Sequence, residues 1–165
     1  MKKCLLVAFI LAATLTVSGC EVLQKDAYDY MSDVKTTKLQ DESTNGMKLG
    51  DSSEKVQEEL GEAKKNEQTD SITHLTYGND GLMIMLIENK VVEYQINSSY
   101  YETVKGIKVG SNKKEVIEQY GQNFYTNKES NTSESIGYFD KESNKHIEFS
   151  LKNGQVIYIK VVDIS

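Results

Sequence analysis

The sequence predicts an α+β fold of two tandem units. Each unit has one helix and an antiparallel sheet of three to four strands, with the helices on one face. Residues 46–61 read GMKLGDSSEKVQEELG and residues 106–121 read GIKVGSNKKEVIEQYG, so one phrase occurs twice at an offset of 60 residues. Each copy is followed by short apolar or alternating stretches that are typical of strands. The sheet of the two units is expected to be either continuous or paired.

The first 20 residues, MKKCLLVAFILAATLTVSGC, are typical of a secretory signal. Lys2 and Lys3 precede an apolar run of about a dozen residues, whereas a membrane-spanning helix needs about 20. The run ends with the letters VSGC at residues 17–20. We therefore predict that residues 1–19 are a signal peptide.

The letters VSGC resemble the lipobox of bacterial lipoproteins, in which the cysteine receives a diacylglyceryl group and becomes the first residue after cleavage. This resemblance implies lipidation of Cys20 and a location on the extracytoplasmic face of the cell membrane. Two acyl chains, at about 0.8 kcal/mol per buried methylene, would anchor the chain stably. The alternative is an ordinary secretory signal that happens to contain a cysteine. The polar residues that follow predict a lipidated cysteine and tether over residues 20–45.

The composition excludes one class of partner. The formal net charge is −6 and the chain contains no arginine, whereas nucleic-acid binding needs a basic surface that neutralises phosphates. Cys4 lies in the segment predicted to be removed, which leaves Cys20 as the one cysteine of the mature chain. An internal disulfide is therefore not expected.

The first predicted unit covers residues 46–98. A helix is expected over residues 52–60, with Asp51 as its N-cap and Gly61 as its stop. The polar residues 62–73 are expected to form a loop or a weak helical turn. The apolar run LMIMLI at residues 82–87 predicts a strand buried on both faces. The strands expected here are His74–Tyr77, Leu82–Ile87 and Val91–Ile96.

The second predicted unit covers residues 99–165 and repeats this plan. Ser111 takes the N-cap position and Gly121 ends the helix. Residues 122–135 are expected to form a loop. The sequence Asn153-Gly154 is a strong hairpin signal between two alternating stretches. The strands expected here are Ile136–Asp140, a strand that begins at His146, and Gln155–Ile164.

The repeated phrase, glycine–apolar–lysine–apolar–glycine followed by a capping residue and a closing glycine, resembles the repeat of the β-lactamase-inhibitor-protein-like superfamily. It is also similar to the SmpA/OmlA (BamE-type) envelope lipoproteins and to tandem domains in secreted proteins of spore-forming bacteria. The resemblance covers about residues 46–162. It implies helices packed on one side of antiparallel strands and a role in binding proteins.

The candidate catalytic patterns favour structural roles. Ser52 and Lys55 have the Ser-x-x-Lys spacing of penicillin-recognising enzymes, as do Ser111 and Lys114, but the partner motifs of those enzymes are absent. Both serines stand where a helix begins, so capping explains them. The two histidines, His74 and His146, lack partners at metal-binding spacing and are expected to be exposed strand residues. We predict that the protein is not an enzyme and holds no cofactor or metal.

Tyrosines supply the candidate contact residues, because tyrosine on an open sheet face is a good anchor for a partner. The alternative is that these tyrosines fill the core or the sheet surface. We expect a lipid-anchored extracytoplasmic protein that acts as a protein-binding or scaffold module of the cell envelope. The alternative function is inhibition of an envelope or secreted enzyme of the β-lactamase or peptidase type. The candidates are Tyr77, Tyr94, Tyr138 and Tyr158.

Overall fold

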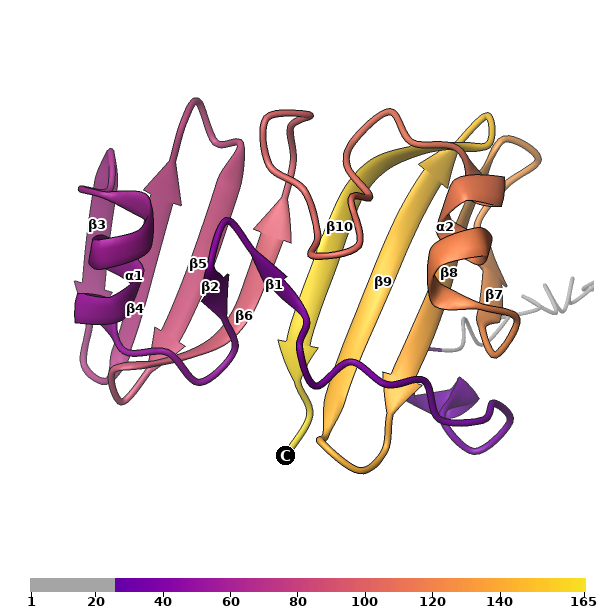
Figure 1. Ribbon diagram of the computed structural model, residues 1–165, viewed down its shortest axis with the longest axis horizontal. Coiled ribbons are helices and arrows are strands. Elements are labelled where there is room, and N and C mark those ends of the chain that lie inside the picture. The colour runs from indigo at the N-terminus through magenta and orange to yellow at the C-terminus, as the bar shows by residue number, and fades with distance from the viewer. Residues whose placement is uncertain (1–25) are drawn as a thin grey trace, which may run out of the picture.

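The computed structural model describes residues 26–165, whose long strands all belong to one antiparallel sheet (Figure 1). In the first half these strands are β3 (Lys65–Thr69), β4 (Ile72–Tyr77), β5 (Leu82–Ile87) and β6 (Lys90–Ile96). In the second half they are β7 (Tyr125–Lys128), β8 (Ser133–Asp140), β9 (Lys145–Lys152) and β10 (Gln155–Asp163). The order across this eight-stranded sheet is β3-β4-β5-β6-β10-β9-β8-β7.

The predicted α+β class with two tandem helix-plus-sheet repeats is wrong. The fold is β-rich, with one eight-stranded sheet, a second sheet of two strands, and two short α-helices among the described residues. The reason is the pairing of β6 with β10, which joins the last strand of one half to the last strand of the other. The two-stranded sheet contains β1 (Ser43–Thr44) and β2 (Met47–Lys48).

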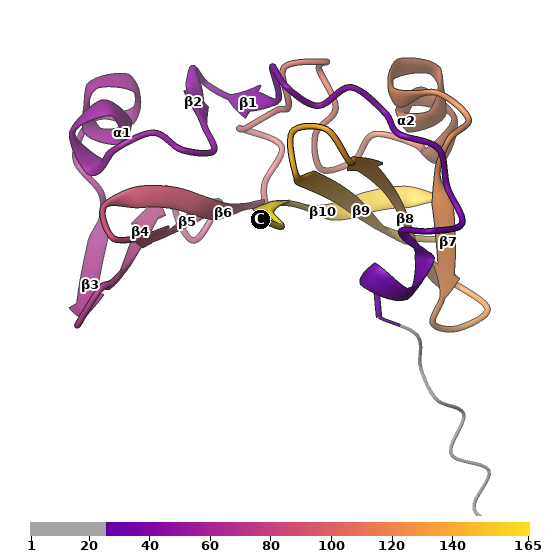
Figure 2. The same ribbon diagram turned by 90° about the horizontal axis from the view of Figure 1, so that it is seen from below.

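Each copy of the repeated phrase forms a helix of eight residues, α1 (Ser53–Leu60) and α2 (Lys113–Tyr120). Both helices lie over the same face of the sheet (Figure 2). Gly61 and Gly121 follow the helices with φ of 77° and 91°, a conformation that disfavours residues with a Cβ atom. The predicted helix stops are therefore present, one in each half.

The helix caps lie one residue later than predicted. Ser52, not Asp51, accepts the hydrogen bond from the backbone of Lys55 at the start of α1. Asn112, not Ser111, caps α2 in a full capping box with Glu115. Asp51 and Ser111 instead stabilise the turns before the helices, because their side chains accept hydrogen bonds from the backbone N–H groups of residues 48 and 108.

The two halves also match in their strands. The backbone N–H of Gly50 donates to the carbonyl of Val91, and that of Gly110 donates to the carbonyl of Val156, both at 2.8 Å. Register shifts fall at equivalent places, one residue beyond each of these valines. Across the junction Gln95 pairs with Lys160, its own equivalent. The junction between β6 and β10 therefore has local two-fold symmetry. The boundary between the two units, predicted between residues 98 and 99, stays a prediction.

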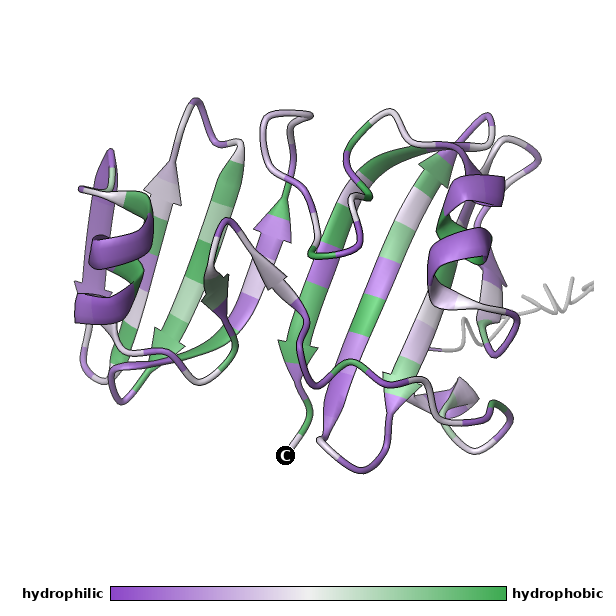
Figure 3. Ribbon diagram, in the orientation of Figure 1, coloured by the Kyte–Doolittle hydropathy of each residue, from purple (hydrophilic) through white to green (hydrophobic). Residues whose placement is uncertain are grey.

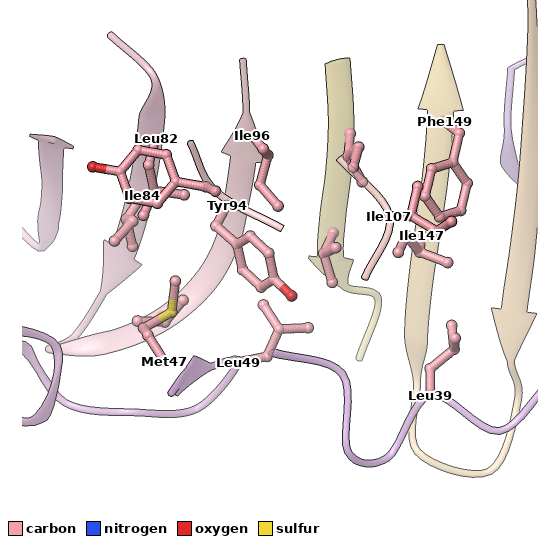
Figure 4. Packing of buried hydrophobic residues seen from close by; sticks show 14 of the residues in the cluster. Leu39, Met47, Leu49, Leu82, Ile84, Tyr94, Ile96, Ile107, Ile147 and Phe149 are labelled. Carbon is pink, nitrogen blue, oxygen red and sulfur yellow. The ribbon is translucent and has the colours of Figure 1, made fainter. Parts of the chain in front are cut away.

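One core runs between the helices and the sheet and continues across the junction. Figure 4 shows Tyr94 and Ile96 of β6 on one side of β10, and Ile107, Ile147 and Phe149 of the second half on the other side. Green and purple alternate along several strands in Figure 3, as expected for a sheet with one covered face. The core thus belongs to both halves.

Part of the predicted tether is packed onto this core. Leu39 is buried, and the buried carboxylate of Glu42 accepts a hydrogen bond from the Tyr120 hydroxyl at 2.7 Å. Burial raises the pKa of the Glu42 carboxyl. The segment that leads from residue 39 into β1 therefore contributes to the fold.

Candidate binding face

The sheet has a second face, turned away from α1 and α2, which we call the helix-free face because neither α-helix lies on it. In Figure 2 the outer strands β3 and β7 bend toward this side. Side chains alternate between the two faces of a strand, so neighbours of buried core residues point to this side. The solvent-exposed side chains of the central strands therefore lie on this face.

In the first half this face carries an apolar surface. Met83 of β5 is 43% exposed, Ile87 is 39% exposed, and Ile72 of β4 is 38% exposed. His74 and Met85 lie directly opposite each other between them. We call these five residues the uncovered patch. A shallow hollow of about 140 Å³ runs along it, lined by His74, Leu75, Thr76, Met83, Ile84, Met85, Glu93 and Gln95.

In the second half the same face is covered by the chain itself. The 3₁₀ helix η1 (Tyr28–Tyr30) lies beneath the sheet near β7 (Figure 2). The Tyr30 ring stacks on the Tyr125 ring with centroids 4.8 Å apart. Further along, the backbone N–H of Thr37 donates to the carbonyl of Phe139 at 2.8 Å. We call residues 26–37 the covering segment.

A polar cluster surrounds Tyr125, in which Tyr125 and His146 are buried and Glu148 is half-buried. The Tyr125 hydroxyl donates to the carboxylate of Glu148 and lies 2.9 Å from Nε2 of His146. Because the single phenolic proton goes to Glu148, Nε2 of His146 is the donor in the second contact. Burial, reinforced by the positive charge of Lys160, lowers the pKa of His146 to about 4. The imidazole is therefore neutral at pH 7.

Burial also raises the pKa of the Tyr125 hydroxyl, and the negative charge of Glu148 adds to the effect. Lys160 forms an ion pair with Glu93 at 3.0 Å, which links β10 to β6 across the junction. Within residues 26–165 no group of three His, Cys, Asp or Glu side chains is arranged to hold a metal ion.

Three of the four predicted contact tyrosines lie in the core. Tyr77 is 5% exposed, and Tyr94 and Tyr138 are both 0% exposed, so none of them can anchor a partner. Tyr77 and Tyr138 have matching structural roles, because their hydroxyls donate to the carbonyls of Gly61 and Gly121. The prediction that these three tyrosines contact a partner is therefore corrected, because their side chains are buried. The alternative, that they fill the core, fits the structure.

Tyr158 is different, because it is half-buried and pairs with Ser150 on the helix-free face.

The two histidines differ in their exposure to solvent. His74 is exposed as expected, whereas His146 is 3% exposed, contrary to expectation. Cys20 and the predicted signal peptide lie outside the described residues.

The sequence interpretation missed the uncovered patch. The apolar run LMIMLI predicts a strand buried on both faces, whereas Met83 and Ile87 are exposed beside buried neighbours. The signal that could have found them is the geometry of an antiparallel sheet, which commonly leaves one face open even when both faces are apolar. Among residues 26–165 no helix has the length and apolar character that crossing a membrane requires.

Comparisons with known proteins give structural matches alone. No protein-family model matches the chain, and no curated protein matches it. An extracellular protein with an SCP domain from Bacillus anthracis matches with a TM-score of 0.49 and 12% identity over 70% of this chain and 44% of the other. A cysteine-rich secretory protein from Staphylococcus aureus matches with a TM-score of 0.47 and 9% identity, over 69% and 42%.

A third similar structure is a candidate β-lactamase inhibitor protein from Streptococcus mutans. Its TM-score is 0.32 and its identity 21%, over 85% of this chain and 99% of the other. The chain spans less than half the length of the first two structures. Two of the three are described as extracellular or secretory proteins.

Proposed function

We propose that this protein is a lipid-anchored, extracytoplasmic binding module whose protein partner docks on the uncovered patch. The observation that carries the proposal is the difference between the two halves of the helix-free face. In the second half the chain's own Tyr30 covers Tyr125, whereas in the first half Ile72, Met83 and Ile87 are exposed to solvent. Contiguous exposed apolar side chains are typical of interaction sites.

The chemistry of the patch suits a protein partner. Methionine has a flexible, polarisable side chain that adapts to apolar surfaces, and Met85 lies in the middle of the patch with Met83 at one end. Glu93 and Gln95 of β6 border the hollow with polar groups. An apolar centre with a polar rim is the usual composition of a protein interface.

The proposed anchor is Cys20, on the basis of its lipobox-like sequence. Metabolic labelling with a radioactive fatty acid tests it in cells that produce the full chain. We expect label in the wild-type protein and none in the Cys20→Ser variant. Equal labelling of the two proteins, or labelling of neither, would refute the anchor.

Site-specific photo-crosslinking tests the docking surface. A photoreactive amino acid replaces Met83 in the membrane-anchored full chain, in cells that produce it naturally. The control places the same group at Val104, which is exposed and follows the strand contact of Thr103 with β1 on the helix side. We expect one crosslinked protein from position 83, absent from position 104 and lost when Ile87→Glu is added.

No crosslink from position 83, or the same proteins from both positions, would contradict docking on the patch. If the captured protein is an enzyme, its activity is measured with and without the purified full chain. Stoichiometric inhibition would then favour an inhibitor, and unchanged activity would favour a scaffold.

We further infer that the protein is not an enzyme. Tyr125, His146 and Glu148 are groups that could move protons, but Tyr125 and His146 are buried and the Tyr30 ring stacks on the Tyr125 ring. Their hydrogen bonds are made to one another. The cluster is better explained as the polar centre of the contact between the covering segment and the sheet.

A further inference from the structure

A second surface of the first half has the form of a strand-binding groove. Two adjoining hollows of about 300 and 410 Å³ lie between α1 and strands β3 and β4, and they share Ser53, Asn66 and Leu75. Figure 2 shows β3 turned away from α1 at this edge of the sheet. Here we call the combined hollow the edge groove. Its remaining lining residues are Glu54, Gln57, Glu62, Ala63, Gln68, Asp70, Ser71, Thr73, Tyr77, Glu88 and Asn89.

The corresponding place in the second half is bridged. Lys113, at the start of α2, forms an ion pair of 2.8 Å with Glu134 of β8. The matching repeats place Ser53 and Thr73 at the equivalent positions of α1 and β4. These side chains are too short to span the same gap, and both line the edge groove instead.

The outer wall of the edge groove is the edge of the sheet. All five residues of β3 are exposed, and β3 pairs with β4 without a register shift. The other side of an edge strand presents unpaired N–H and C=O groups to solvent, which form a template for another strand. A partner that adds a strand gains main-chain hydrogen bonds and places alternate side chains on opposite faces.

The edge groove is negatively charged, which favours a positively charged partner. Its lining contains four acidic residues, Glu54, Glu62, Asp70 and Glu88, and no Lys or His. Three of the four lysines that adjoin lining residues in the sequence are engaged elsewhere, since Lys55 pairs with Glu59 at 2.7 Å, Lys64 donates to Asn79 at 2.6 Å and Lys65 contacts Asp80 at 3.5 Å. The fourth is Lys90, which follows the lining residue Asn89. Opposite charge on a partner would therefore favour association.

We propose that β3 accepts an extended, lysine-bearing segment of a partner protein as a ninth strand, with lysine side chains directed toward the edge groove. This surface is separate from the uncovered patch, so the proposal does not depend on docking there. The added strand would lie beside β3, with its alternate side chains next to Asn66 and Gln68 on the groove side.

The test uses the full-length protein in detergent micelles and a blocked peptide of about ten residues, the upper end of usual strand lengths, that alternates threonine and lysine. A matched peptide carries glutamate in place of lysine. Binding is followed by NMR shifts and by amide hydrogen exchange. We expect the lysine peptide to bind about tenfold more tightly than the glutamate peptide, less so at high salt, with slowed exchange in residues 65–69.

The decisive variant is Ser53→Lys with Thr73→Glu, which transplants the ion pair of the second half and closes the edge groove. We expect it to weaken binding of the lysine peptide by about tenfold. The matched control, Lys113→Ser with Glu134→Thr, should leave binding unchanged. Should the closing variant misfold, Glu54→Lys with Glu88→Lys replaces it, and this pair should reverse the preference toward the glutamate peptide.

The proposal is overturned if both peptides bind alike or neither binds. It is also overturned if the shifts fall on β7 instead of β3, or if the folded closing variant binds as well as the wild type. If the uncovered patch binds its partner independently of the edge groove, these variants leave crosslinking from position 83 unchanged. Failure of one surface is therefore distinguishable from failure of the other.

Discussion

Single residues decide which parts of this sheet are available to a partner. Gly137 is an example, because a Cβ atom there would lie 2.4 Å from the Tyr125 ring. The absence of a side chain lets Tyr125 lie flat across the sheet and meet Tyr30, His146 and Phe139. One glycine therefore permits the aromatic contact that holds the covering segment against the second half.

The buried His146 predicts how stability depends on pH. Its pKa of about 4 in the folded state lies below the ordinary value of about 6.5. Between these values the unfolded chain binds a proton that the folded chain does not, so the free energy of unfolding falls as pH drops through this window. The full loss is on the order of 3 kcal/mol, and above pH 6.5 the contribution is constant.

Urea unfolding of the wild type and of His146→Gln at pH 4.5 and pH 7 checks this effect. The difference between the two proteins isolates His146, because Glu42 and the other carboxyls are present in both. We expect the wild type to lose more stability than the variant on acidification. Parallel losses would mean that the imidazole is as easily protonated in the folded protein as in the unfolded one.

At the scale of elements, the repeated phrase predicted both helices and their glycine stops because local chemistry determines them. The outer strands were not predicted. The segments KNEQT in β3 and YTNK in β7 are polar and lie at the sheet edges, so they lack the apolar alternation by which half-buried strands are detected. Their strand structure comes from pairing with β4 and β8, which is a tertiary effect.

The candidate site was predicted less well than the elements. Tyrosine suits a surface anchor and a half-buried strand equally, and the sequence does not state which face of a strand the helices cover. Ile84 is buried and Met83 is exposed in one uninterrupted apolar run. What distinguishes them is the layer of α1, β1, β2 and α2, which covers only one face of the sheet. The edge groove likewise depends on the short side chains of Ser53 and Thr73. Their importance becomes clear only when they are compared with the ion pair of Lys113 and Glu134 at the equivalent positions of the second half.

At the scale of the whole molecule, the shared core predicts cooperative unfolding. Val56 of α1 and Val116 of α2 are fully buried at equivalent positions of the two halves. Val56→Ala and Val116→Ala should each cost about 2 kcal/mol and lower the midpoint of one common thermal transition. Scanning calorimetry checks this prediction. Two separate transitions, each sensitive to only one variant, would show that the halves unfold independently.

The symmetry of the junction between β6 and β10 has a further consequence. Gln95 pairs with its equivalent Lys160, and Tyr94 and Ile96 pair with the equivalents of each other. A polypeptide that ended after β6 would therefore carry a self-complementary edge and could form an isologous dimer with an identical copy. Joining the two copies in one chain makes this association independent of protein concentration. The chain is in this sense an internal dimer whose protomers share one backbone.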